Sequence, residues 1–480
     1  MEFLHRLIHA GTAFLDRPAI PWKPLILAFA LGEYGLESYL AWRQYRVLQR
    51  TRVPAQLQHE IDQKTYDKSQ AYGRSKYWFG LVRGLYAQVK NVLVIRGDVY
   101  KHLWVLVGGF VARWMPAVLR GEITQSLVFV FAYFWLETIT SLPFSYYNHF
   151  YVEEKFGFNK LTVKLWVTDL LKSQALAVIF GVPIGAAFLK IIQKTGDSFF
   201  LYIWLFTLAI QLATTTIYPI LIVPLFNTLT PLPAGELKER VEALATRLHF
   251  PLAELRVIDG SRRSAHSNAY FTGLPWKKTI VLYDTLIEKS EVGEVEAVLA
   301  HELGHWSMGH TMQLMGIASA HLFWVFALFS GFVGNRSLYR AFGFGGDVGE
   351  KGMVPGMPIM IGFILFNEVL SPTDSLVQLA MNIWTRRMEF QADAFSQSLG
   401  YSAELARSLI KLQIQNLSAM DADWMYSAYH YSHPILTERL KALGWKSEQK
   451  VSDSKKPAAN GHVGGVASTG TNDLREKVEL

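Results

Sequence analysis

Residues 301–305 read His-Glu-Leu-Gly-His, a pattern in which a glutamate follows the first of two histidines. Apolar residues recur along 292–301 at the spacing of a helical face, so the motif is expected on a helix. Histidines four positions apart then lie on one side of the helix, and both imidazoles can reach one zinc ion. Glu302 points about 100° away and can act on a water beside the metal. The motif predicts His301 and His305 as zinc ligands of a peptidase, and a chance match or a structural histidine pair is the alternative.

A third protein ligand is needed, because catalytic zinc sites leave one position open for water. The best candidate lies where Glu389 and Asp393 stand four residues apart on an expected helix. Glu389 can bind the metal, and Asp393 can accept a hydrogen bond from the second ring nitrogen of a ligand histidine. An ordinary acidic helix paired with Arg386 and Arg387 is the alternative.

The composition indicates a membrane protein. Half of the 480 residues are hydrophobic and only 18% are charged, whereas soluble proteins carry about 25% charged residues. A helix needs about 20 apolar residues to cross a bilayer. Seven segments meet this need, and a buried core helix can explain any single one but not all of them: about 24–42, 102–119, 125–147, 173–192, 198–228, 312–333 and 358–384. The expected fold is a predominantly α, polytopic membrane protein.

Basic residues predict the orientation of these spans. The segment 43–101 is expected as a loop, and its many Lys and Arg residues place it in the cytosol. Counting spans from there puts the N-terminus outside the cell or in a lumen. Residues 148–172, residues 229–311 and the C-terminal region then face the cytosol. The first 18 residues lack a signal-peptide layout, so the first span is expected to act as the insertion signal.

Several classes of function are excluded or disfavoured. The chain has no cysteine, which excludes disulfides, thiolate metal ligands and a cysteine-protease mechanism. The net charge of +7 is interpreted as membrane topology and attraction to anionic lipid. No nucleic-acid motif is found, and no nucleic-acid partner is expected. Residues 448–480 are rich in Ser, Gly, Ala and Lys and are expected to form a disordered tail.

Acidic residues interrupt some of the spans. A carboxylate facing lipid is costly, so such residues usually face a bundle interior or water. Two interpretations remain open: a hydrated cavity in which a peptide meets the metal, or paired polar residues that fix helix packing. The residues concerned are Glu33, Glu37, Glu137, Glu368 and Asp374.

A small α+β region is expected between the fifth and sixth spans. A polar turn and a helix are predicted over 231–250, followed by strands at 255–260, 268–273 and 279–283. Many metallopeptidases hold a peptide as an added strand on a sheet edge. Residues 267–271 are the candidate edge, and a purely structural hairpin is the alternative.

A last group of residues is His430-Tyr-Ser-His433-Pro, followed by Glu438 and Arg439. A histidine near the metal can donate a hydrogen bond to the oxyanion that forms during attack. A histidine before proline in a loop usually has no such function, so this group predicts little by itself.

Together these stretches resemble the type I CaaX prenyl endopeptidases, integral-membrane zinc metalloproteases. The resemblance extends to about residue 447. It rests on the two zinc motifs and on Glu153-Glu-Lys-Phe-Gly-Phe-Asn159, Phe226-Asn-Thr-Leu-Thr-Pro-Leu-Pro233, His266-Ser-Asn-Ala-Tyr-Phe-Thr-Gly273 and Tyr431-Ser-His-Pro434.

The resemblance implies seven transmembrane helices around a hollow chamber, with a small α+β zinc-peptidase subdomain at its cytosolic end. It implies one Zn²⁺ per chain, held by His301, His305 and Glu389, with Glu302 as catalytic base. It also supports Asp393 as a partner of a ligand histidine and His433 as oxyanion donor, and it maps Asn268 and Ala269 to the substrate edge.

The implied reaction is removal of the last three residues after a prenylated cysteine, and in fungal pheromone precursors also an N-terminal cut. The implied location is the membrane of the endoplasmic reticulum and the inner nuclear membrane. The expected division of the chain is helices I–V in 1–228, a catalytic subdomain in 229–311, helices VI–VII in 312–384, a catalytic C-terminal region in 385–447, and the tail.

Two other functions compete with this reading. A broad quality-control protease for membrane proteins would use the same zinc site without needing a prenyl group. A membrane scaffold with a vestigial metal site would be expected to lack Glu302 or Glu389, and both are present.

Overall fold

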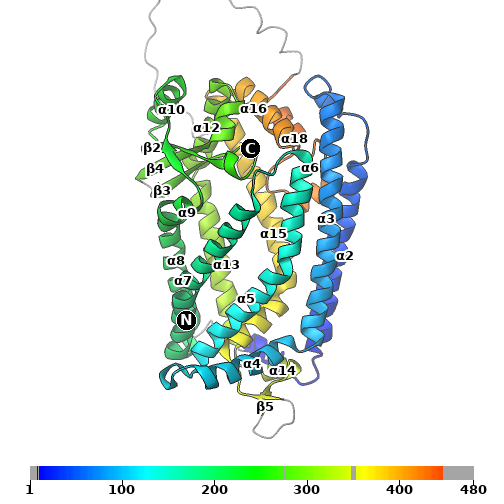
Figure 1. The fold of residues 1–480 in the computed structure, drawn as a ribbon, viewed down its shortest axis with the longest axis vertical. Helices are drawn as coiled ribbons and strands as arrows, with labels where there is room; N and C mark the ends of the chain where they lie inside the picture. The colour runs from blue at the N-terminus through cyan, green and yellow to red at the C-terminus, as the bar shows by residue number, and fades with distance from the viewer. Residues whose placement is uncertain (1–7, 9, 275, 347–352, 447–480) are drawn as a thin grey trace, which may run out of the picture. The chain divides into compact units, whose positions relative to one another are not determined.

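Long apolar helices make up most of the chain in the computed structural model (Figure 1), which describes residues 8, 10–274, 276–346 and 353–446. The expected tail, 448–480, lies outside the described residues. Five helical segments of this part are long and apolar enough to cross a membrane: Glu122–Phe156, Val163–Thr195, Phe199–Phe226, His310–Phe332 and Ile359–Ser398. They agree with the last five spans expected from the sequence, and the chain is a mostly helical, multi-pass membrane protein.

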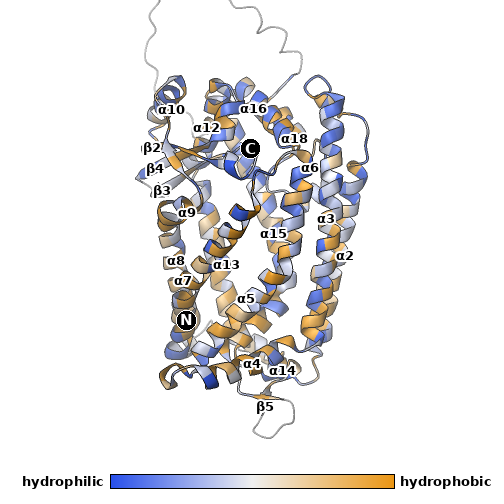
Figure 2. Cartoon of the chain, viewed as in Figure 1, coloured by the Kyte–Doolittle hydropathy of each residue, from blue (hydrophilic) through white to orange (hydrophobic). Residues whose placement is uncertain are grey.

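These five segments are built mainly from α5 (Glu122–Tyr147), α7 (Val163–Thr195), α8 (Phe199–Ile217), α13 (His310–Phe332) and α15 (Ile359–Ser398). The first continues through a π-helical turn and the short α6, and the third through a second π-helical turn into α9: Asn148–Glu153, Glu154–Phe156, Tyr218–Ile222 and Val223–Phe226. In Figure 2 hydrophobic residues dominate α7 and α8, whereas α10 (Glu236–Arg247) is largely hydrophilic.

The N-terminal third differs from the prediction. Residues 43–101 do not form a loop, because they contain the 34-residue helix α3 (Gln63–Arg96), which packs beside α2 (Trp22–Val47). The expected span 102–119 is also wrong in length, since α4 (Val99–Trp114) ends before Pro116. The proline fixes an extended backbone after α4, which ends the helix. The many basic residues of α3 led to the prediction of a loop, although this segment forms a helix that runs along α2.

A mixed four-stranded sheet lies beside the helix that carries the zinc motif. Its strands follow the order β1 (Leu229–Pro231), β2 (Leu252–Ile258), β4 (Lys277–Tyr283) and β3 (Ala269–Leu274). Strands β2 and β4 are parallel, while β1 and β3 pair antiparallel with their neighbours. The predicted helix and three strands are therefore confirmed, and the sequence missed β1. Strand β3 forms the edge of the sheet.

The remaining elements lie at the two ends of the helical bundle. Near the zinc motif are α11 (Asp284–Lys289), α12 (Val292–Ser307), α16 (Ser402–Gln415), α17 (Trp424–His430) and α18 (Leu436–Ala442). At the opposite end in Figure 1 are α4, α14 (Arg336–Ala341) and a two-stranded sheet of β5 (Phe344–Gly346) and β6 (Val354–Pro355). Each end has its own buried apolar clusters.

The acidic residues within the spans show both expected behaviours. Glu33 accepts a hydrogen bond from Ser375, Glu137 pairs with Lys90, and Glu368 accepts one from Tyr100 at 2.7 Å. Glu37 instead lines a cavity near the zinc motif. Most of these carboxylates are thus satisfied by polar partners, as the membrane interior requires.

Candidate active site

Helix α12 presents the two motif histidines to α15. It begins with a capping box, in which the Glu291 amide donates to the Glu294 carboxylate at 2.9 Å. Its buried residues face the sheet, α15 and α16, and only 6% of His301 is exposed. Helix α15 brings Glu389 and Asp393 against this face, and both of these carboxylates are buried. The structure therefore brings together the two helices on which the sequence placed the ligands.

Three side chains could hold a metal ion here: His301, His305 and Glu389. Their facing atoms are 3.2 Å apart between the two Nε2 atoms, 3.5 Å between His301 and Oε2, and 3.3 Å between His305 and Oε1. Zinc bonds of about 2.0–2.1 Å in a tetrahedron separate ligand atoms by about 3.4 Å. The observed spacing fits such a site, and two nitrogens with one carboxylate are a donor set that zinc favours.

A buried oxygen supports the same reading. Oε2 of Glu389 is shielded from solvent and lies only within longer ion-pair distances of described residues, 3.5 Å from His301 and 3.6 Å from Arg439. An unsatisfied buried carboxylate oxygen costs free energy, and native sites usually provide a partner for it. A cation beside His301 and His305 would satisfy this oxygen.

The orientation of His301 is fixed by a buried ion pair. Its Nδ1 lies 2.9 Å from Oδ1 of Asp393, and Arg439 donates to both oxygens of that carboxylate at 2.8 and 2.6 Å. Burial opposes the charged ring of His301, but its hydrogen bonds to Asp393 and Glu389 outweigh this effect and raise its pKa above the ordinary value. Nδ1 is thereby occupied, and Nε2 is left to face Glu389.

Arg439 is the residue whose position the sequence did not reveal. It follows Glu438 in a stretch that predicts no function for it, and it lies 46 residues from Asp393 in the chain. The one feature of the sequence that could have indicated a role for Arg439 is its position six residues after His433. Only folding of α18 against α15 brings the two together.

Glu302 lies on the same helix as the two histidines, with its side chain partly buried. Burial raises the pKa of its carboxyl, while the nearby histidines His301 and His305 work in the opposite direction. A carboxylate held in this way is suited to accept and return a proton.

His433 reaches the same cluster from the loop after α17. Its Nε2 lies 3.3 Å from Oε1 of Glu389, although 65% of its side chain is exposed. Its Nδ1 lies 3.0 Å from the Ser432 hydroxyl, which can donate to it. This hydrogen bond favours the tautomer with the proton on Nε2, which then points to the cluster. His433 thus joins the candidate site as a donor.

The candidate substrate edge lies next to the zinc helix. Strand β3 contacts α12 and pairs with no described strand other than β4. Asn268 is exposed just before the strand, and Ala269 begins it with a buried side chain. The Asn268 carbonyl accepts from the Tyr283 amide at 3.1 Å, and its side chain accepts from the Ala269 amide at 2.8 Å. The start of β3 is therefore held by these hydrogen bonds, and α8 packs against the strand as well as α12.

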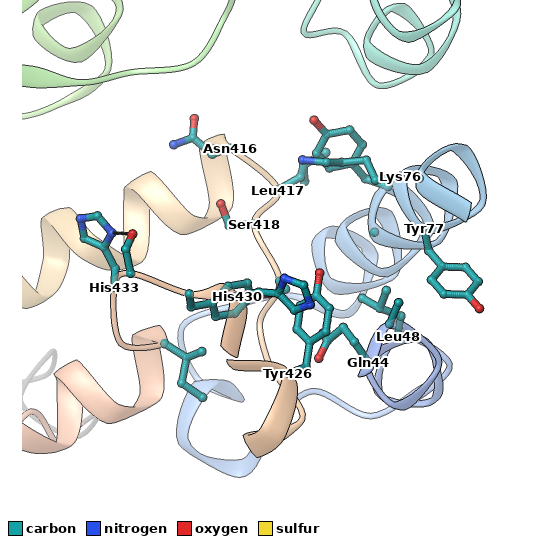
Figure 3. Close-up of a pocket in the computed structure, with 18 of the residues that line it drawn as sticks. Gln44, Leu48, Lys76, Tyr77, Asn416, Leu417, Ser418, Tyr426, His430 and His433 are labelled. Carbon is teal, nitrogen blue, oxygen red and sulfur yellow. Dashed lines mark hydrogen bonds between the residues drawn. The ribbon is translucent and has the colours of Figure 1, made fainter. Parts of the chain in front are cut away.

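A cavity of about 890 Å³ opens beside these residues. Figure 3 shows His433 on one wall and Lys76 and Tyr77 of α3 across the space. His266, which precedes the edge strand, and His430 also line it. The lining mixes tyrosines, glycines and charged groups, so the cavity can take up both a peptide and water.

Comparison with known proteins identifies the family of the chain. Residues 44–228 match the family model of the CAAX prenyl protease N-terminal region with five membrane helices, and residues 231–446 match peptidase family M48. CAAX prenyl protease 1 of Saccharomyces cerevisiae is 45% identical over 91% of this chain and 98% of its own length. CAAX prenyl protease 1 homolog of Homo sapiens is 38% identical over 87% and 94%.

A solved structure agrees. The crystal structure of S. mikatae Ste24p superposes with a TM-score of 0.85 at 44% sequence identity, covering 89% of this chain and all of the other. The resemblance noted in the sequence is thus confirmed. The chain belongs to the CAAX prenyl proteases of peptidase family M48, and it is a membrane-embedded zinc metalloendopeptidase.

Proposed function

We propose that His301, His305 and Glu389 bind the catalytic zinc of this enzyme. The observation that carries the proposal is the spacing of their facing atoms, 3.2 to 3.5 Å, together with the buried oxygen of Glu389 that has only long contacts. Asp393 holds His301 so that Nε2 faces the metal position. Arg439 in turn holds Asp393.

The remaining site residues handle protons and charge. Zinc, when bound, polarises the scissile carbonyl and makes water a stronger nucleophile. Glu302 takes a proton from the attacking water onto its carboxylate and later delivers it to the leaving amine. His433 donates from Nε2 to the carbonyl oxygen as negative charge develops there. The Ser432 hydroxyl keeps His433 in the tautomer that can do so.

The proposed substrate is a prenylated protein ending in CaaX, from which the enzyme removes the last three residues. The names of the relatives support this substrate class. The peptide is expected to add as a strand along β3, with main-chain bonds at Asn268 and Ala269. The adjoining cavity of about 890 Å³ provides room beside the scissile bond.

We also infer a hollow chamber enclosed by seven membrane helices. In the segments Glu122–Phe156 and Phe199–Phe226, only 6% of the apolar 18-residue stretch is buried. In Val163–Thr195 the buried share is 11%. A helix packed against a filled bundle buries a broad stripe of its surface. Such low burial supports open space on the inner side as well as lipid on the outer side.

The end of the helical bundle that carries His301, His305 and Glu389, here called the zinc end, is proposed to face the cytosol. The proposed location is the membrane of the endoplasmic reticulum and the inner nuclear membrane. Basic residues around the α2–α3 connection support this orientation. Arg43 binds Asp423 at 2.8 Å and Arg50 pairs with Asp421, so this basic region lies at the zinc end. These basic residues support the proposed orientation although α3 is a helix and not a loop.

The division of labour along the chain follows from these assignments. We propose helices I–V in 1–228, a catalytic subdomain in 229–311, helices VI–VII in 312–384 and a catalytic C-terminal region in 385–447. One apolar cluster supports it by joining β2, β4, α10 and α12 with residues of 399–412.

The test is cleavage of a farnesylated CaaX peptide by the purified enzyme, beside its unprenylated twin. We expect cleavage after the prenyl-cysteine that stops with a chelator, returns with zinc and is much faster for the prenylated peptide. Equal cleavage of both peptides would instead support a general quality-control protease. Zinc-loaded, folded protein that cleaves neither peptide would refute the proposal.

A further inference from the structure

The second zinc-motif histidine has a partner that the proposed mechanism does not use. His310 is the first residue of α13, and only 2% of it is exposed. Its Nδ1 lies 2.9 Å from Nδ1 of His305, and its Nε2 lies 3.1 Å from Oε1 of Gln391 on α15. The three side chains form one continuous line of contacts that ends on the helix carrying Glu389.

The turn between α12 and α13 creates this arrangement. Helix α12 ends at Ser307, and Gly309 has a left-handed backbone with φ of 67° before α13 begins. A left-handed backbone is favourable for glycine and separates the end of one helix from the start of the next. The side chain of His310 then lies beside His305, on the Nδ1 side of that ring.

The hydrogen-bond roles follow from the proposed zinc site, on which this inference rests. If Nε2 of His305 faces the metal, its Nδ1 carries the proton and must donate. Nδ1 of His310 is then the acceptor, so the proton of His310 sits on Nε2 and is donated to the Gln391 carbonyl oxygen. Every ring nitrogen in the line has one role, and no alternative pattern satisfies all of them.

The two zinc-motif histidines therefore have different supports. His301 donates to a carboxylate that is paired with Arg439, whereas His305 donates to a neutral imidazole. Ligand histidines usually donate to a carboxylate, a backbone carbonyl or water. A neutral partner fixes the orientation of His305 without adding negative charge to the metal position.

We propose that His310 and Gln391 are positioning residues that hold His305 in the zinc-binding tautomer and orientation. His310 acts directly on His305, and Gln391 acts through His310. Neither side chain touches the substrate or the metal.

The test compares three variants of the full-length enzyme at His310. His310→Leu removes the acceptor, and His310→Asn places an amide oxygen near the position of Nδ1. His310→Gln places its amide near the position of Nε2 instead. Zinc affinity is measured by competition with a chelator, and the cobalt-substituted proteins give the visible spectrum of the metal site.

We expect His310→Leu to lose about 10- to 100-fold in zinc affinity and to alter the cobalt spectrum. His310→Asn should recover most of the affinity and the wild-type spectrum, and His310→Gln should not. Wild-type affinity and spectrum in His310→Leu would overturn the proposal, as would equal losses in His310→Leu and His310→Asn.

Variants at Gln391 provide a second test if His310→Leu does not fold. Gln391→Met removes the acceptor for His310, while Gln391→Glu keeps one. A weaker zinc affinity in the first and not in the second supports the proposal, and no difference overturns it. His301→Ala distinguishes failure of this proposal from failure of the zinc site. If His301→Ala retains zinc, the proposed zinc site itself is refuted. If His301→Ala loses zinc but the His310 variants bind it normally, only the positioning role is refuted.

Discussion

Glu302 can be separated experimentally from the two histidines beside it. Glu302→Gln keeps the size of the side chain but cannot take a proton, so the variant should bind zinc and lose turnover by at least about a hundredfold. Peptide cleavage and elemental analysis of the same preparation check this. Near-normal turnover with a full complement of zinc would contradict the role as base.

His301→Ala gives the opposite result, because it removes a proposed ligand. We expect this variant to lose zinc along with activity, while remaining folded in the membrane. Elemental analysis of the purified protein measures the loss. Metal retained at the wild-type ratio would remove His301 from the ligand set.

Acid should weaken zinc binding. In the metal-free protein, hydrogen bonds to Asp393 and Glu389 raise the pKa of His301, so the ring carries a proton at neutral pH. Zinc must displace that proton, and the apparent affinity should fall by about tenfold per pH unit from this group as pH decreases below the raised pKa. Chelator competition between about pH 6 and pH 8 measures how steeply the zinc affinity changes with pH. A flat profile would contradict the ion pair with Asp393.

Arg439 is expected to matter for stability as well as for zinc. Arg439→Ala would leave Asp393, only 1% exposed, as a buried charge with His301 as its remaining partner. Breaking one side of such a pair typically costs about 3–5 kcal/mol. Thermal unfolding in detergent should show this, and the double variant with Asp393→Asn should recover part of the loss. No change in unfolding temperature for Arg439→Ala would be inconsistent with the pair.

At the residue scale, the sequence predicted those site residues whose relative positions depend on one helix only. The His-Glu-x-x-His motif and the Glu389–Asp393 spacing each depend on a single helix, so periodicity alone places their side chains. Arg439 meets Asp393 across 46 residues, and His310 meets Gln391 across 81, so the packing of separate helices and not a local spacing brings these side chains together. His433 lay between these cases, since its loop motif suggested nothing without the family resemblance.

At the scale of elements, the contact between α12 and α15 sets the distance between the proposed ligands. A Cβ added at Gly304 would lie 3.1 Å from Phe395 Cβ and 3.3 Å from Ala392 Cα. Gly304→Ala should push the two helices apart, cost about 1–3 kcal/mol and weaken zinc binding. Gly293→Ala on the same helix meets only Glu404 Cγ at 3.7 Å and is the control. Equal zinc affinity in the two variants would show that the helices can adjust.

Helix α3 explains the main error of the sequence-based fold. Hydropathy finds helices that face lipid all round, but α3 packs on α2 and lines the cavity with Gly73, Lys76 and Gly80. A helix with polar surroundings on one side needs no continuous apolar run. The catalytic region was predicted better, because turn residues and alternating apolar residues marked three of the four strands of its sheet.

At the scale of the whole molecule, the orientation can be read chemically because the chain has no cysteine. Glu239→Cys places a thiol on the exposed face of α10 at the zinc end, and Val118→Cys places one at the opposite end, where the native side chain is 95% exposed. In sealed vesicles with the cytosolic face outward, an impermeant maleimide should label the first at once and the second only after permeabilisation. The reverse pattern would place the zinc end in the lumen.

Helix α15 joins the membrane to the metal without interruption. Its 40 residues run from Ile359 through Pro372 to Glu389 and Asp393. Proline removes one backbone hydrogen bond and makes a natural pivot. From Pro372 to Glu389 is about 25 Å along the axis, so each degree of tilt moves the carboxylate by about 0.4 Å. Catalytic groups tolerate about 0.5 Å of displacement. Because helices tilt to match bilayer thickness, a tilt of α15 about Pro372 is expected to move Glu389 and to change the rate of proteolysis.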